Sequence, residues 1–180
     1  SGISKSPAVF DIEKLRWRNA EYMKKLSSEE FFEKAEPWLK KAISNPAIDL
    51  RKVAALVQSR CEILSDLPER VDFIDKLPDY ETELYIHKKS KTNLENSLET
   101  LEVLLPILQA QEDWSNEALY EKLVAVAAER GVKNSVILWP LRVAVSGKAS
   151  TPGGATELCA LLGKEESLAR IEKGIALLRK

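Results

Sequence analysis

The spacing of apolar residues constrains the fold of this chain more than any other feature of its sequence. Along most of the 180 residues, apolar side chains recur every three or four positions, the period of an α-helix that buries one face. Only 7 glycines and 8 prolines interrupt the pattern, and valine and isoleucine are scattered rather than gathered in alternating runs. The sequence therefore predicts an all-α protein.

Capping residues indicate where several of these helices begin and end. Asp11 is a predicted N-cap, and Ser27 followed three residues later by Glu30 has the pattern of a capping box. Ser115 is a further predicted N-cap, and the helix after it is expected to close at Gly131.

Proline gives weaker signals about helix boundaries. Pro37 is expected to kink or interrupt the second helix, and a short helix is predicted to begin near Pro140. The next helix is predicted to be capped by Thr151, with Pro152 at its first position, and a last helix is predicted from Lys164.

The periodic pattern lapses around residues 77–80, which suggests a boundary between two parts of the chain. A chain of this length is long enough for two small cores. We therefore expect two small helical modules in tandem, a helix bundle over 1–80 and a second helical module over 81–180.

Composition favours an ordinary globular protein of the cytoplasm. The chain is 44% hydrophobic and 31% charged, and it has neither an apolar run long enough to span a bilayer nor the apolar core of a signal peptide near its start. Cys61 and Cys159 lie far apart and match no disulfide or zinc spacing, so we expect both to be small buried apolar residues.

Charge is unevenly distributed although the net charge is only -1. Residues 92–121 contain seven acidic residues and no Lys or Arg, whereas residues 132–156 contain Lys133, Arg142 and Lys148 and no acidic residue. The second window also has Trp139 and the expected helix start after Thr151, a mixture suited to single-stranded RNA. The alternative is that Trp139 belongs to the core and the charge bias is chance.

No group of residues with catalytic spacing is found in the sequence. The run from His87 through Lys88, Lys89, Ser90 and Lys91 is similar to a lysine-rich ATP-binding loop, but no glycine-rich phosphate cradle accompanies it. We therefore expect a solvated loop. The lone histidine also argues against a metal site, a nucleophilic triad and an independent enzyme.

Two separated motifs resemble the anticodon-binding, C-terminal half of bacterial glutamyl-tRNA synthetases. The first begins at the residues Ser6-Pro7-Ala8-Val9-Phe10-Asp11 and continues through Lys14, Leu15, Trp17, Asn19 and Tyr22. The second is Pro140-Leu141-Arg142-Val143-Ala144-Val145-Ser146-Gly147, then Thr151-Pro152-Gly153, Glu157-Leu158 and Leu161-Leu162-Gly163-Lys164-Glu165. The resemblance covers the chain from about Ser6 to its end.

This resemblance implies two all-helical modules that bind the anticodon loop of glutamate tRNA. In the family a catalytic domain precedes this region, and it uses ATP and Mg²⁺ to activate glutamate. The resemblance therefore implies a monomer that works with its own catalytic domain, with no cofactor in this part of the chain and no catalysis by this part alone.

The resemblance also assigns a role to Arg60, which falls where family members that discriminate keep an arginine that contacts the third anticodon base. Cytosine offers O2 and N3 as acceptors to a guanidinium, whereas guanine presents donors that would be left unpaired. The alternative is a surface arginine that pairs with Glu62 or Asp66.

In the second module the resemblance points to one arginine and one loop. Arg142 falls on an RNA-contacting arginine of the family, and the loop from Ala149 through Thr151, Pro152 and Gly154 falls on its base pocket. Gly154 and the following Ala155 are smaller than the residues some relatives have, so we expect backbone contacts there rather than stacking. Trp139 either stacks on a base or packs inward.

A different class of function stays open on the sequence alone. The chain could be a helical scaffold for protein interactions that binds no RNA. That hypothesis predicts an exposed apolar stripe on the acidic helix, formed by Leu94, Leu98, Leu101 and Leu105.

Overall fold

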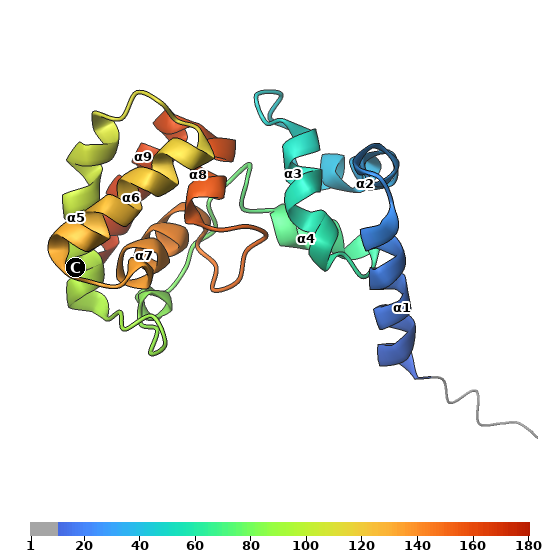
Figure 1. Cartoon of the computed structure of the whole chain (residues 1–180), viewed down its shortest axis with the longest axis horizontal. Coiled ribbons are helices and arrows are strands. Elements are labelled where there is room, and N and C mark those ends of the chain that lie inside the picture. The colour runs from blue at the N-terminus through green and yellow to red at the C-terminus, as the bar shows by residue number, and fades with distance from the viewer. Residues whose placement is uncertain (1–10) are drawn as a thin grey trace, which may run out of the picture. The chain divides into compact units, whose positions relative to one another are not determined.

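Figure 1 shows a computed structural model of the chain, which describes residues 11–180. Within that range the chain forms α-helices and short 3-10 turns, and the only β-type pairing is an isolated bridge between His87 and Thr92. The all-α prediction is confirmed. No helix in residues 11–180 is long and apolar enough to cross a membrane. The motif residues 6–10 lie outside the described part.

Contacts along the chain divide it into two compact units. Unit 1 runs up to Ser44 and resumes over Asp49–Val71, and unit 2 comprises Asn45–Ile48 and Asp72–Lys180. Residues 72–80, which the sequence pattern placed with the first module, therefore pack within unit 2.

Unit 1 is a small bundle in which α2 packs against α3 and α4. Its elements are α1 (Ile12–Lys25), α2 (Ser28–Ala42), α3 (Leu50–Val57), η2 (Gln58–Arg60), η3 (Leu64–Asp66) and α4 (Leu67–Val71). Phe31, Leu39 and Val57 are at most 2% exposed in its core. Complete burial of a side chain of this size stabilises the fold by about 1.5–3 kcal/mol.

Sequence signals locate the helix starts of unit 1 correctly. The Asp11 side chain accepts a hydrogen bond from the backbone N–H of Lys14, and Ser27 and Glu30 form the capping box at the start of α2. Pro37, by contrast, lies inside α2 and does not interrupt it. The helix continues because residues on both sides of the exposed proline, including Leu39, are buried in the core.

Unit 2 is built around α5 and α7, which contact each other and both contact α9 (Figure 1). Its elements are η4 (Thr82–Tyr85), α5 (Leu94–Gln109), α6 (Asn116–Arg130), α7 (Asn134–Ser146), α8 (Ala155–Leu162) and α9 (Lys164–Leu178). Ser115 caps α6, Gly131 ends it in the left-handed conformation, and α9 begins at Lys164, as predicted.

The prediction of a short helix from Pro140 is wrong, because α7 begins at Asn134 and has Pro140 in its interior. An interior proline leaves the carbonyl four residues earlier without its helical donor. That carbonyl belongs to Val136, and the hydroxyl of Thr100 on α5 donates to it at 3.4 Å. The neighbouring helix thus supplies the missing donor, which a local sequence pattern does not reveal.

Candidate nucleic-acid interface

Arg60 is the last residue of η2 in unit 1 and is exposed to solvent. Helix α1 packs against this short turn. Among residues 11–180, no hydrogen bond or ion pair engages the Arg60 guanidinium. Its five donors are therefore available to a ligand.

The two carboxylates expected to compete for Arg60 face another arginine. Arg16 on α1 lies 3.8 Å from the Glu62 carboxylate and 3.6 Å from that of Asp66. The alternative in which Arg60 pairs with Glu62 or Asp66 is therefore wrong in this structure. Both ion pairs are exposed and loose, so they contribute little to stability, but they partly neutralise the acidic charge near η2.

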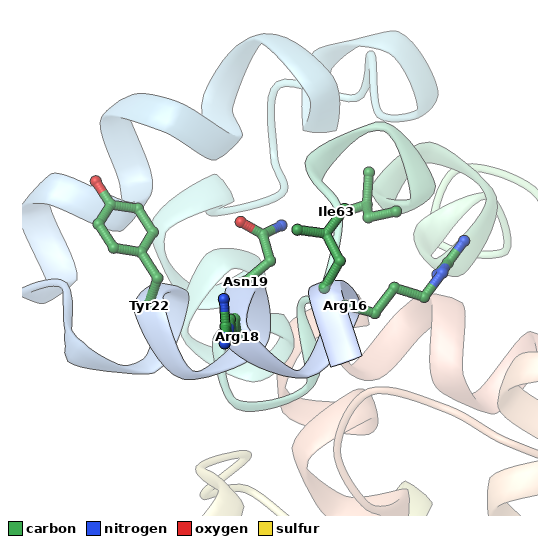
Figure 2. A pocket seen from close by; sticks show the side chains of 6 residues that line it. Arg16, Arg18, Asn19, Tyr22 and Ile63 are labelled. Carbon is green, nitrogen blue, oxygen red and sulfur yellow. The ribbon is translucent and has the colours of Figure 1, made fainter. Parts of the chain in front are cut away.

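A shallow hollow of about 290 Å³ lies along α1 in the same unit. Figure 2 shows Tyr22 at one end of it, Arg16 at the other and Arg18 and Asn19 between them. The Asn19 side chain donates to the carbonyl of Glu62, which fixes α1 to the segment that follows Arg60. The hollow is open on one side, its walls are mainly apolar with the polar groups of Arg16, Arg18 and Asn19 among them, and it lies on the helix that packs against η2.

In unit 2 the candidate loop begins where α7 ends at Gly147, whose φ of +66° is the left-handed conformation that glycine adopts without strain. The Ser146 hydroxyl donates to the Arg142 carbonyl at 2.6 Å and accepts from the Lys148 N–H at 3.1 Å. The Lys148 ammonium lies 2.6 Å from the Asp72 carboxylate. These contacts hold the start of the loop in one conformation.

The second half of the loop differs from the prediction at Thr151, which does not cap a helix. Thr151 is 3% exposed and its hydroxyl donates to the Gly153 carbonyl at 2.8 Å, so it closes a turn around Pro152. Helix α8 begins only at Ala155, with Gly154 as its N-cap. The Glu157 carboxylate accepts from the Gly154 N–H at 2.9 Å.

The expected open helix start is therefore partly occupied by a carboxylate of the chain itself. Gly154 and Ala149 are exposed, whereas Thr151 is buried and Pro152 is half-buried. The exposed backbone of this loop is what it offers to a ligand. Ala155 is 4% exposed and offers no stacking surface.

Trp139 on α7 is engaged on several sides. Its indole N–H donates to the Leu84 carbonyl at 2.9 Å, and the His87 ring stacks on it with centroids 3.7 Å apart and planes 10° apart. The Arg142 guanidinium lies 4.7 Å from the indole centroid. A half-buried indole with these partners has little free face for a base.

Arg142 connects Trp139 to the loop. Its guanidinium donates to the Ala149 carbonyl at 2.6 Å while it lies over the indole. The structure thus brings together Trp139, Arg142 and Ala149, and the loop continues through Thr151, Pro152 and Gly154. Arg60 belongs to the other unit.

A buried arginine that the sequence pattern did not reveal contacts the end of α7, just before this loop begins. Arg170 on α9 is 2% exposed and donates to the carbonyls of Phe73 at 2.8 Å, Ile74 at 3.0 Å and Val145 at 2.7 Å. Its Nε also donates to the Glu166 carboxylate at 2.7 Å. Without the Arg170 side chain, the carbonyls of Phe73, Ile74 and Val145 would lose their donor, which is costly for buried groups. The hydrogen bonds of Arg170 therefore hold the end of α7, at Val145, in place. Nothing in the sequence distinguishes Arg170 from a surface arginine.

Within the described range, no group of three or more His, Cys, Asp or Glu residues could hold a metal ion. The features of the candidate interface are instead cations, exposed backbone and a fixed loop.

Two solved structures that share this fold are glutamate–tRNA ligases. The chain superposes on a glutamate tRNA ligase from Elizabethkingia meningosepticum, solved in complex with its amino acid, with a TM-score of 0.76 and 23% identity over 94% of this chain and 33% of that one. The glutamate-tRNA synthetase of Elizabethkingia anophelis gives a TM-score of 0.71 and 22% identity over 93% of this chain and 32% of that one. At these identities the likeness establishes the fold.

The chain belongs to the anticodon binding domain family, whose sequence model matches residues 30–175. It is 49% identical over 177 residues to the glutamate–tRNA ligase of Clostridium tetani and 52% identical over 177 residues to that of Clostridium kluyveri. Each match covers 98% of this chain and 36% of the relative. The chain is thus homologous to the anticodon-binding region of these ligases and spans about a third of their length.

Proposed function

We propose that the chain recognises the anticodon loop of glutamate tRNA for a glutamate–tRNA ligase. The two units act as two RNA-binding modules, with Arg60 presented by one and the segment from Arg142 to Gly154 by the other. In this proposal the rest of the ligase uses ATP and Mg²⁺ to charge the tRNA, and the protein works as a monomer in the cytoplasm.

One observation supports the role of Arg60 most strongly. Its guanidinium is exposed and has no partner in the described part of the chain, while Arg16 faces the nearby carboxylates of Glu62 and Asp66. A free guanidinium can donate to O2 and N3 of cytosine, whereas guanine would place its N1–H and N2–H donors against it. Discrimination at one base is worth about 1–3 kcal/mol by analogy with other base contacts.

In unit 2 the proposal assigns contact roles to the Arg142 guanidinium and to the exposed backbone at Ala149 and Gly154. Trp139 supports Arg142 rather than stacking on a base. Thr151 and Pro152 shape the turn that presents this backbone. The scaffold alternative is weakened, because only Leu94 of its four leucines is exposed, whereas Leu101 is fully buried and Leu98 and Leu105 are half-buried.

Binding to two anticodon stem-loops that differ only in the third anticodon base, cytosine or guanine, tests this proposal. We expect the wild-type chain to prefer cytosine by about tenfold or more at low salt, and Arg60→Ala to remove the preference. Arg51→Ala is the matched control, because Arg51 is also an exposed arginine of unit 1 but pairs with Glu29. Equal binding of both loops by the wild-type chain would refute the role of Arg60.

A further inference from the structure

The turn between His87 and Thr92 in unit 2 is a fixed structure rather than a loose loop. His87 and Thr92 exchange backbone hydrogen bonds of 3.2 and 3.1 Å, and the Lys91 N–H donates to the Lys88 carbonyl at 3.1 Å. The turn is closed on itself, and the side chains of Lys88, Lys89 and Lys91 are exposed.

Three neighbouring elements hold this turn in place. The Ser135 hydroxyl on α7 donates to the Ser90 carbonyl at 3.2 Å, and the Thr92 hydroxyl donates to the carbonyl of Tyr85 at 2.7 Å. The Asn96 side chain on α5 donates to the Lys91 carbonyl at 3.0 Å. The three lysines therefore project from a rigid base, which lowers the entropy cost of a contact by their side chains.

Lys91 has a φ of +60°, and it is the only residue other than glycine with a positive φ in the described range. Glycine or asparagine fits this conformation with less strain. The chain instead has a third cation there, at the cost of backbone strain. Strain of this kind is more common at functional sites than elsewhere.

No carboxylate within residues 11–180 forms an ion pair with Lys88, Lys89 or Lys91. Glu81 and Glu83 in the preceding segment are exposed and form no ion pair with these lysines either. The turn thus presents three positive charges that form no ion pair within the described part of the protein.

Direct contacts connect this turn to the candidate loop. His87, at the base of the turn, stacks on Trp139, the Arg142 guanidinium lies over the same indole, and Arg142 donates to the carbonyl of Ala149. A continuous series of side-chain contacts within unit 2 therefore links the base of the lysine turn to the loop that begins after α7.

We propose that Lys88, Lys89 and Lys91 form a phosphate-binding edge of the RNA interface in unit 2, where they contact the backbone of the bound RNA. This inference rests on the proposed function, because it takes the same RNA as the ligand. Lysine ammonium groups act as point charges on phosphate and do not distinguish bases. The turn therefore strengthens binding without contributing to the choice of anticodon.

The test replaces all three lysines and measures affinity for the cytosine and guanine stem-loops over a range of salt concentrations. Lys88→Gln and Lys89→Gln remove two charges, and Lys91→Asn removes the third while tolerating the positive φ. We expect both loops to bind on the order of tenfold more weakly at about 50 mM salt, with their ratio unchanged. The slope of log affinity against log salt should become shallower by about 0.7–0.9 for each phosphate group that the variant no longer binds.

A matched control separates this site from a general effect of charge. Lys122→Gln, Lys173→Gln and Lys180→Gln remove three exposed lysines from other positions of unit 2 and should leave the affinity nearly unchanged. An unchanged affinity in the variant of the turn would overturn the inference and leave the proposed function intact. An equal decrease in the control, or a changed ratio between the two loops, would also overturn it. Failure of the wild-type chain to bind either loop would instead refute the proposed function.

Discussion

Arg60 owes its availability to the residues around it. Arg16 lies against the two nearby carboxylates, and the Asn19 side chain fixes α1 to the segment after η2. The sequence places Arg60 close to acidic residues, but it does not tell which arginine they face. That outcome depends on the packing of α1 against η2, which is a tertiary contact.

Burial also changes the acidity of the two cysteine thiols. Cys61 and Cys159 are at most 2% exposed, as predicted, and burial raises the pKa of Cys61 to about 11 and that of Cys159 to about 12. An exposed thiol in the unfolded chain has a pKa of about 8.5. Between these values the unfolded chain releases protons that the folded chain retains, so rising pH favours unfolding.

We therefore expect the free energy of unfolding to be insensitive to the thiols below about pH 8 and to fall as the pH rises from about 9 toward 11. The slope is at most about 1.4 kcal/mol per pH unit for each thiol. Urea unfolding at a series of pH values measures it. The Cys61→Ala, Cys159→Ala double variant should show a shallower slope than the wild-type chain, and equal slopes would contradict this explanation.

At the scale of elements, helix boundaries that depend on local capping were predicted correctly and those that depend on distant donors were not. Ser27 and Ser115 cap their helices with their own hydroxyls, and such signals are visible in the sequence. The start of α7 was missed because Thr100 supplies the donor that Pro140 lacks. The start of α8 was missed because Thr151 bonds to Gly153 instead of capping a helix.

Residues 78–80 pack closely against Gly147 at the end of α7, so a methyl group added at Gly147 should lower the stability of the protein. A Cβ at Gly147 would lie 3.0 Å from Cδ1 of Tyr80 and 3.1 Å from Cγ of Pro78, whereas a Cβ at Gly131, with nearly the same φ, meets nothing within 4 Å. Gly131→Ala should cost about 1 kcal/mol of stability from backbone strain alone. Gly147→Ala should cost at least about 1 kcal/mol more, and it should also weaken RNA binding.

Urea unfolding of the two variants in parallel measures this difference. Because the two glycines have nearly the same φ, backbone strain contributes equally to both losses of stability. The difference between the two losses therefore reports the contact with Tyr80 and Pro78. Equal destabilisation by the two substitutions would show that this contact does not constrain the loop.

A second glycine sets the distance between α9 and its neighbours. Glycine inside a helix is normally about 1 kcal/mol less favourable than alanine, but a Cβ at Gly174 would lie 2.7 Å from Oη of Tyr85 and 3.2 Å from Cδ1 of Leu101. Gly174→Ala should therefore destabilise the protein. Removal of the hydroxyl by Tyr85→Phe relieves the closest contact, although it also removes the 2.7 Å hydrogen bond to Tyr80.

A double-mutant cycle of Gly174→Ala and Tyr85→Phe, followed by thermal or urea unfolding, tests this packing. We expect the loss of unfolding free energy in the double variant to be smaller, by about 1 kcal/mol or more, than the sum of the losses in the two single variants. Additive effects would mean that the hydroxyl does not limit the approach of α9.

At the scale of the whole molecule, charge is balanced at 27 basic and 28 acidic residues, so attraction to RNA cannot arise from net charge. In our proposal it arises from local cations: Arg60 in unit 1, and Arg142 with the lysines of residues 88–91 in unit 2. Family resemblance points to both arginines from the sequence, whereas the lysines became informative only when the fixed turn and the stack of His87 on Trp139 were seen. Arg170 was missed because burial is not visible in a local pattern.

A map of the RNA contact on both units at once is the most direct test of the proposed anticodon recognition. Amide chemical shifts of the isotope-labelled chain are recorded while a glutamate anticodon stem-loop is added. We predict that shifts change at η2 around Arg60, across residues 142–154 and at the lysine turn, while the acidic face of α5 is unaffected. Changes confined to α5, or none at saturating RNA, would contradict the proposal.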